Sequence, residues 1–127
     1  MLTDGSNPVP DAKELIRRGQ RRLALEMLEP WVEEHPGDDS AWAAIAGAYF
    51  GLGDLQEAHD AAAKVVELRG TARDWCNYGM ILRKLGHLKD AERALYKALT
   101  LQPGYDHART ELHKVHLALT AKDDDYV

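Results

Sequence analysis

The sequence predicts an all-α fold, a right-handed helical-repeat solenoid of three helix hairpins followed by a C-terminal capping helix. The first observation is an internal repeat, because the pattern of residues 39–68 returns over residues 72–101, with Trp42 matched by Trp75. The second is that apolar residues within each copy recur with the period of a helix. A repeat of this length buries its apolar face only against neighbouring repeats, so the copies are expected to stack into an array.

The chain is expected to begin with a polar tail, residues 1–8, and a degenerate repeat, residues 9–38, whose first helix is short. Pro10 is tolerated in the first turn of that helix. Gly19 ends it, because glycine takes the left-handed C-terminal turn without a Cβ clash. Trp31, in the second helix, is expected to fill core volume that the short first helix leaves empty.

Two fuller repeats are expected over residues 39–71 and 72–105, and a glycine (Gly53 or Gly86) marks the reversal within each. Small residues such as Gly79 allow the two helices of a hairpin to approach closely. Larger side chains are expected to fill the volume around them, namely Trp42, Tyr49, Leu55, Trp75, Leu82 and Leu88.

These two repeats resemble the tetratricopeptide repeat, a helix-turn-helix of about 34 residues with the pattern W-x2-L-G-x2-Y, then A-x3-F, then P. The pattern's positions are filled in the first copy by Trp42, Ile45, Ala46, Tyr49, Ala58 and Ala62, and in the second by Trp75, Tyr78, Gly79, Leu82, Ala91, Leu95, Ala98 and Pro103. The first copy departs from the pattern with Ala46 in place of the glycine, Ala62 in place of the second large residue and Gly70 in place of the proline, and none of these changes the helical prediction. The resemblance implies a protein-binding module.

The last helix is expected over residues 106–120, because Ala108, Leu112, Val115 and Leu119 share one face. It is predicted to cap the array, followed by a disordered acidic tail over residues 121–127. The whole chain is therefore expected to be a single domain. The helices are predicted near residues 10–18, 21–34, 40–51, 55–68, 73–84, 88–101 and 106–120.

Composition and charge exclude several classes of protein. The formal net charge of −5 argues against a nucleic-acid partner, since phosphate binding requires a basic surface. No apolar run approaches the roughly 18 residues of a membrane helix, so no membrane association is expected. The first residues lack the basic start and apolar core of a signal peptide, which favours a cytoplasmic location.

The sequence also lacks the motifs of known catalytic and metal sites. It has no glycine-rich phosphate loop, no serine elbow and no CxxC or HExxH spacing, so we expect no enzyme activity and no cofactor. The one cysteine, Cys76, is expected to act as a small apolar residue. His107, His113, His116 and Glu111 do not reproduce the ligand spacings of zinc sites, so no metal is expected.

The resemblance implies that partners bind a concave groove lined by the first helix of each repeat. The expected groove residues are Ser40, Ala43, Ala44, Gly47, Phe50, Arg73, Asn77, Met80, Lys84, Thr110 and Lys114. Small side chains at Gly47 and its neighbours would admit a peptide backbone, and the Asn77 amide could hydrogen-bond to it. Close packing of neighbouring helices is the other explanation for the small residues.

A well-known subclass of the family binds the C-terminal carboxylate of chaperone tails through lysine, asparagine and arginine side chains. The corresponding positions here do not carry that set, and Glu111 would repel a carboxylate.

A second candidate surface is the turn with Arg17, Arg18, Arg21 and Arg22. Its ordinary explanation is a solvated turn that faces Glu14 and Glu26.

The sequence therefore predicts a protein-interaction adaptor that binds a peptide segment or helix of another protein. Two alternatives remain open. One is a chaperone-like holder of a partner segment, and the other is a structural subunit that assembles through its end repeats, which would make a homo-oligomer. The sequence does not identify the partner.

Overall fold

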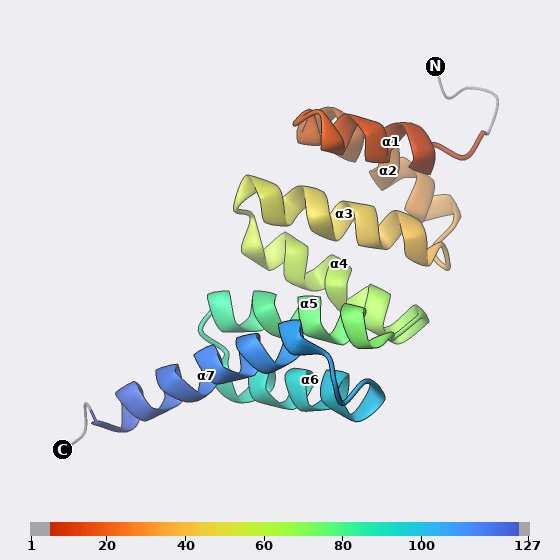
Figure 1. Cartoon of the computed structure of the whole chain (residues 1–127). Coiled ribbons are helices and arrows are strands. Elements are labelled where there is room, and N and C mark those ends of the chain that lie inside the picture. Colours follow the sequence, from red (N-terminus) through yellow and green to blue (C-terminus); the bar gives the residue numbers. More distant parts are fainter. Residues whose placement is uncertain (1–5, 125–127) are drawn as a thin grey trace. The chain divides into compact units, whose positions relative to one another are not determined.

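The computed structural model describes residues 6–124, with side chains as far as Lys122. In this part of the chain all regular secondary structure is helical (Figure 1). The helices are α1 Val9–Arg17, α2 Arg21–Glu34, α3 Asp39–Leu52, α4 Leu55–Leu68, α5 Ala72–Lys84, α6 Leu88–Leu101 and α7 Asp106–Asp124. The prediction of an all-α helical-repeat fold is confirmed.

The first six helices begin and end within one residue of their predicted limits, and the two ends of the chain differ. Pro8 is buried as the N-cap of α1, so it does not belong to a polar tail. At the other end α7 continues to Asp124, so the predicted disorder of residues 121–124 is wrong. The helix continues because the sequence from Ala118 onward contains no glycine or proline that would stop it. Residues 1–5 and 125–127 lie outside the described part.

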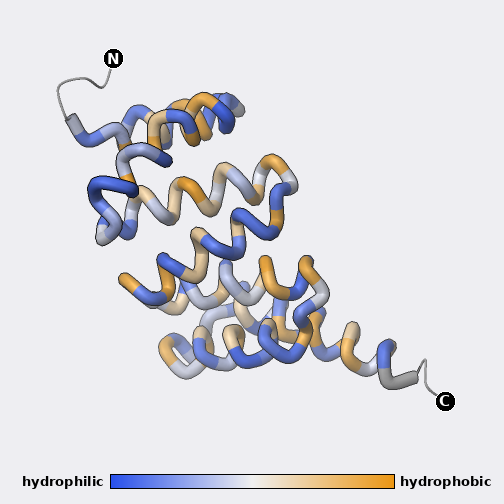
Figure 2. The backbone as a smooth tube through the Cα atoms, turned by 180° about the vertical axis from the view of Figure 1, so that it is seen from behind, coloured by the Kyte–Doolittle hydropathy of each residue, from blue (hydrophilic) through white to orange (hydrophobic). Residues whose placement is uncertain are grey.

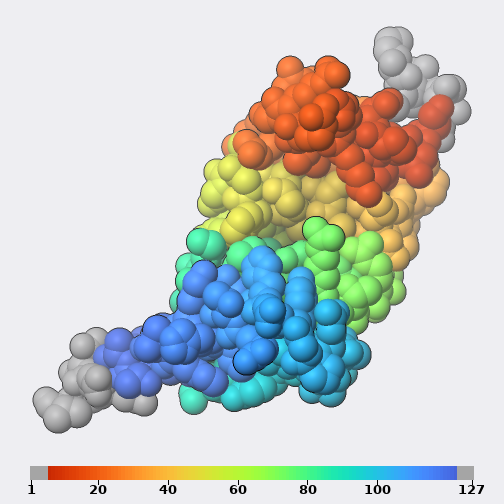
Figure 3. Space-filling model, viewed as in Figure 1, coloured from red at the N-terminus to blue at the C-terminus, as the bar shows by residue number. Residues whose placement is uncertain are grey.

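The contacts between helices divide the chain into two compact units, residues 1–68 and 69–127. In the first unit α1 packs on α2, α2 on α3 and α3 on α4. In the second unit α5 pairs with α6, and α7 packs on both of them, where it lies at the surface in Figure 3. Hydrophilic and hydrophobic residues are mixed along most of the helices, as expected of amphipathic helices, whereas α3 is mainly apolar (Figure 2). The single-domain organisation stays a prediction.

Alanine is the most frequent residue in the core of each unit. In the second unit the buried cluster is Cys76, Leu82, Ala91, Ala94, Leu95, Ala98, Ala108, Leu112 and Val115. The contact between α5 and α6 is closest at Gly79, where a Cβ would lie 2.7 Å from Cγ of the fully buried Leu95. Small residues therefore bring the helix backbones together in this hairpin.

This close packing corrects the prediction about the large residues. Of those expected to fill the core, Leu82 is buried, at 3% exposed. The others are half-buried, namely Trp42, Tyr49, Leu55, Trp75 and Leu88. Helices that meet through alanine and glycine leave little space for a ring between them, so the aromatic side chains lie along the margins of the core.

The turns between helices have definite chemical causes. Gly53 and Gly86 have φ angles of 80° and 85°, and Gly19 has 84°, so the predicted glycine turns are confirmed. Helix α3 starts at the N-cap Asp38, whose carboxylate accepts from the backbone N–H of Ala41. Helix α5 starts with a capping box formed by Thr71 and Asp74.

Trp31 is not the core residue that the sequence suggested. It is half-buried, its ring stacks on His35 with centroids 3.7 Å apart, and its Nε1 donates to Oδ2 of Asp38 over 2.9 Å. The indole N–H of Trp42 donates to the carbonyl of Pro36, also over 2.9 Å. Two tryptophans therefore hold the loop between α2 and α3.

Candidate functional site

The predicted groove residues of the first unit share one stripe of α3. Gly47 is exposed, and a Cβ built there would meet nothing within 4 Å. Ser40, Ala43 and Phe50 are half-buried. Ala44 is buried, at 8% exposed, so it is a core residue and is not available to a partner. The small side chain of Ala44 is therefore explained by packing in the core. The absence of a side chain at Gly47 instead leaves the surface of α3 open.

The predicted residues of α5 lie in the second unit and form a second stripe. Arg73, Asn77, Met80 and Lys84 follow one another at alternate spacings of four and three, which places them on one face of the helix. Met80 is half-buried and the other three are exposed. Among the described residues, Arg73 and Asn77 have no polar partner within the chain. Both side chains can therefore form hydrogen bonds with another molecule.

The predicted residues of α7, Thr110 and Lys114, are exposed and one helical turn apart. Between them lies Glu111, which is 3% exposed. Its Oε1 accepts from Nζ of Lys114 over 3.1 Å, and its Oε2 accepts from Nε of Arg83 over 3.0 Å. This ion-pair network joins α5 to α7. We call the surface formed by Arg73, Asn77, Met80, Lys84, Thr110 and Lys114 the α5–α7 face.

The network changes the role of Glu111. Burial would raise the pKa of its carboxyl group, but hydrogen bonds and charges from Lys114 and Arg83 outweigh that effect and hold the pKa below its ordinary value. Glu111 is therefore an ionised carboxylate whose negative charge is paired with Lys114 and Arg83, and the expectation that it repels a partner carboxylate stays a prediction. Sequence reasoning missed Arg83 altogether. The only sequence signal was the spacing of Glu111 and Lys114, which permits a pair on one helix.

Cys76 is a core residue, as predicted. It is 1% exposed and packs in the cluster of the second unit. Burial, with a smaller contribution from the charge of Glu111, raises the pKa of its thiol to about 11. The thiol is therefore protonated and shielded at neutral pH, which makes it a poor nucleophile.

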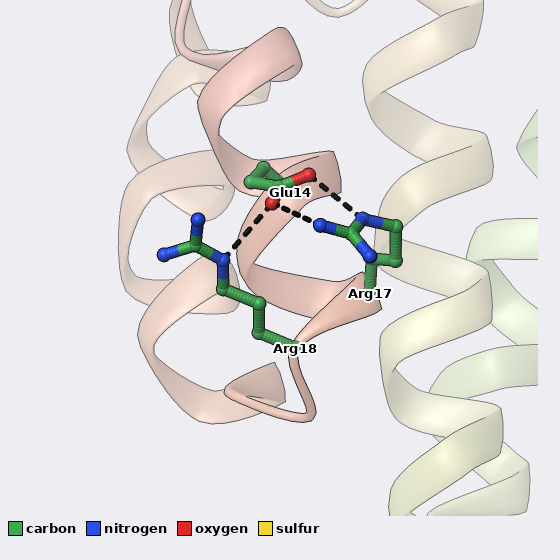
Figure 4. Close-up of polar contacts among 3 residues, drawn as sticks. All are labelled: Glu14, Arg17 and Arg18. Carbon is green, nitrogen blue, oxygen red and sulfur yellow. Dashed lines mark hydrogen bonds and ion pairs between the residues drawn. The ribbon is translucent and has the colours of Figure 1, made fainter.

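Acidic side chains of the chain itself pair with most of the arginines in the turn between α1 and α2. Glu14 accepts from Nε of Arg17 and from Nε of Arg18, both over 2.9 Å (Figure 4). The bond from Arg17 lowers the pKa of Glu14. Arg22 pairs with Asp54 at 3.4 Å. The predicted contact with Glu14 is confirmed, whereas Asp54 takes the place expected for Glu26.

The histidines of α7 do not converge. His107 and His113 are exposed, while Nε2 of His116 lies 2.9 Å from a carboxylate oxygen of Glu92 on α6. Within residues 6–122, whose side chains the structure describes, no group of three or more histidine, cysteine or acidic side chains could hold a metal ion. No helix in the same range is long and apolar enough to cross a bilayer.

The family model described as Tetratricopeptide repeat matches residues 39–71 and 72–105, which together make up just over half of the chain. The chain belongs to the tetratricopeptide repeat family. This confirms the resemblance noted in the sequence, and the matched ranges coincide with the second and third expected repeats. The first unit thus holds one matched tetratricopeptide repeat, formed by α3 and α4, and the second unit holds another, formed by α5 and α6.

Solved tetratricopeptide structures share the fold. The second such domain of human RPAP3, in complex with the HSP70 peptide SGPTIEEVD, is 23% identical, with 84% of this chain and 90% of that one covered at a TM-score of 0.79. The first such domain of Spaghetti (RPAP3), bound to the HSP90 peptide SRMEEVD, is 21% identical, with coverages of 87% and 89% and a TM-score of 0.81.

A crystal structure of MamA is also similar. It is 21% identical, with 96% of this chain and 74% of that one covered at a TM-score of 0.85. At these identities the likeness shows the fold alone. No curated protein matches the sequence.

Proposed function

We propose that this tetratricopeptide chain is a non-enzymatic interaction adaptor, and that its α5–α7 face binds a peptide segment of a partner protein. The observation that carries the proposal is Asn77. It is an exposed amide on the stripe of α5 that also holds Arg73, Met80 and Lys84, and it makes no polar contact with any described residue. An amide both donates and accepts, so it can pair with the N–H and C=O groups of an extended peptide.

The neighbours of Asn77 suit the same use. Arg73 lies one turn before it and can fix the direction of a segment through a charged hydrogen bond. Met80, half-buried one turn after it, offers a flexible apolar contact to a partner side chain. In the first unit, the exposed position Gly47 on α3 has open space around it. We propose the stripe of α3 around it as a separate, independent partner surface of that unit.

Related structures support a peptide as the ligand. The two RPAP3 domains of the same fold are bound to chaperone peptides. This chain does not carry the lysine, asparagine and arginine set that binds chaperone tails in the subclass noted above. We therefore propose the same class of ligand, a short peptide segment, with different residues making the contacts.

Calorimetric titration with the binding segment of a partner tests the proposal. The partner would be captured with the full chain, its binding segment mapped, and that segment titrated against variants. Asn77→Ala is expected to weaken binding by about 1–3 kcal/mol, the cost of leaving a peptide group unpaired. Met80→Ala is expected to weaken binding as well, because it removes the apolar contact from the same face.

Gln102→Ala is the matched control, because it removes an exposed amide from the loop after α6. It is expected to leave the affinity unchanged. All variants are expected to keep the parent circular dichroism spectrum. Unchanged affinity in both Asn77→Ala and Met80→Ala would contradict the proposal.

A further inference from the structure

The charge of the α5–α7 face differs from that of the chain. The protein carries a formal net charge of −5, yet every charged side chain of α5 outside the core is a cation, namely Arg73, Arg83 and Lys84. The only acid of α5 is Asp74, which is buried and held by both Nε and Nη2 of Arg69 at 2.9 and 2.8 Å. Helix α5 therefore presents positive charge without an exposed carboxylate.

Helix α7 adds Lys114, whose side chain is 49% exposed, and with it the carboxylate of Glu111. Glu111 accepts from both Lys114 and Arg83, so one internal carboxylate lies between two cations. It cancels part of their charge and orients both groups. A carboxylate approaching Lys114 from solvent competes with Glu111 for the same ammonium group.

We propose that the partner segment bound by the α5–α7 face is acidic in its side chains, and that Glu111 determines how strongly the face prefers acidic segments. The inference rests on the proposed function and names the chemical class of its ligand. Arg73, exposed and without a polar partner among the described residues, makes the first contact with a partner carboxylate. Glu111 limits the contribution of Lys114, because its own negative charge remains in place.

The face does not need the end of a partner chain. A terminal carboxylate is held when several donors converge on one point. Here Arg83 and Lys114 converge on Glu111, and their distances of 3.0 and 3.1 Å show that this point is already occupied. Arg73 can pair with a single carboxylate at one end of the stripe. A glutamate or aspartate side chain within the partner segment supplies that carboxylate. Blocking the C-terminus of a partner peptide is therefore expected to have no effect.

Designed peptides test the charge preference without knowledge of the natural partner. The probes are an acetylated and amidated glutamate-rich octapeptide, the same peptide with a free C-terminus, and a version with glutamine in place of every glutamate. Fluorescence anisotropy at low and moderate salt is expected to show roughly tenfold tighter binding of both glutamate peptides than of the glutamine peptide, decreasing with salt. Equal binding of the glutamate and glutamine peptides, or dependence on a free C-terminus, would overturn the inference.

Variants then test the individual residues. Arg73→Gln is expected to weaken binding of the amidated glutamate peptide several-fold. Lys97→Gln, which removes an exposed cation from α6, is expected to change nothing. Glu111→Gln is expected to tighten binding of the glutamate peptide by about three- to tenfold and to leave the glutamine peptide unaffected, since only an acidic ligand benefits from the released charge. A purely structural role of Glu111 would not produce that gain.

If Glu111→Gln fails to fold by circular dichroism, Lys114→Gln supplies the same information from a surface position. It is expected to weaken binding of the glutamate peptide and to leave binding of the glutamine peptide unchanged. An unchanged affinity for the glutamate peptide would overturn the role of the ion-pair network around Glu111. The proposed function can also be judged separately. A natural partner segment that depends on Asn77 but not on Arg73 or on salt would leave the adaptor function standing and remove this inference.

Discussion

The loop between α2 and α3 depends on a few polar atoms around Asp38. One carboxylate oxygen caps α3 through the N–H of Ala41 at 3.1 Å, and the other accepts the indole N–H of Trp31 at 2.9 Å. Trp42 holds the same loop through the carbonyl of Pro36. The tryptophans thus act through their N–H groups as well as their area, which is why both rings lie at the edge of the core.

Trp42→Ala is expected to lower the free energy of unfolding by about 2–3 kcal/mol, less than for a fully buried ring, because the side chain is only half-buried. Trp42→Phe keeps much of the contact area and should cost about 1 kcal/mol for the lost hydrogen bond. Urea unfolding followed by circular dichroism measures both. His113→Ala, at an exposed site, is the control within about 0.5 kcal/mol. A Trp42→Ala protein as stable as the parent would show that the loop contact has no role in stability.

Two buried carboxylates make stability depend on pH in the acid range. Burial opposes ionisation of both Asp74 and Glu111, but hydrogen bonds from Arg69 and Thr71 to Asp74, and from Lys114 and Arg83 to Glu111, leave each pKa below its ordinary value of 3.8 or 4.5. The unfolded chain therefore binds these protons more readily than the folded chain. Their stabilising contribution is complete above about pH 4.5 and is lost as the pH falls through the lowered values.

Urea midpoints measured between pH 7 and pH 3 test this dependence. The urea midpoint of the parent is expected to stay constant down to about pH 4.5 and to fall steeply below that pH. Glu111→Gln, which has no proton to bind at that position, is expected to show a shallower decline. An identical pH profile in parent and variant would show that Glu111 does not contribute.

At the scale of the helix, the two glycines Gly47 and Gly79 have opposite roles. Gly79 on α5 faces α6, and a Cβ there would approach Cγ and Cδ2 of Leu95 to 2.7 and 2.9 Å. Leu95 is completely buried, so it has little freedom to move away. Gly47 on α3 is exposed and has open space around it. A side chain added at Gly79 therefore meets closely packed atoms of α6, whereas one added at Gly47 extends into open space.

Gly79→Ala is expected to destabilise the protein by about 1–3 kcal/mol, because overpacking outweighs the gain in helix propensity. Gly47→Ala is expected to stabilise it by about 0.5–1 kcal/mol, because only the propensity changes. Thermal melts of the two variants beside the parent compare them directly. Melting shifts of the same sign in both would contradict the close contact between α5 and α6.

At the scale of the whole molecule, the chain forms two compact units, and the second has its own core from α5, α6 and α7. Cys76 lies inside that core and is the only cysteine in the sequence. It therefore serves as a natural probe for the opening of this unit. Its thiol is both shielded and, with a pKa raised to about 11, protonated.

A thiol reagent at neutral pH is expected to react with Cys76 at the rate at which the second unit opens, far more slowly than with the denatured chain. Gly79→Ala should speed the reaction, because it loosens the core around the thiol, whereas Gly47→Ala on α3 should not. Labelling followed by mass spectrometry measures the rates. Fast labelling of the native parent, close to that of the denatured chain, would contradict the burial of Cys76.

The candidate site was predictable in part. The positions of Arg73, Asn77 and Lys84 within the repeat predict that they line the groove, and the structure exposes all three. Ala44 was counted on the same basis and is buried, because small residues occur equally at a groove and at a helix contact. Arg83 and Glu111 lie 28 positions apart on two different helices, so no local sequence pattern predicts their pairing.

The sequence by itself determined the helices, their glycine turns and the family, because helical periodicity, turn glycines and the repeat pattern are local and recur along the chain. Only the tertiary structure decided which large residues enter the core, since that depends on how closely two backbones approach at Gly79 and its equivalents. It also decided that Glu111 is a buried, ion-paired carboxylate: the ionisation of a buried group depends on the groups that surround it, and Arg83 reaches Glu111 from another helix.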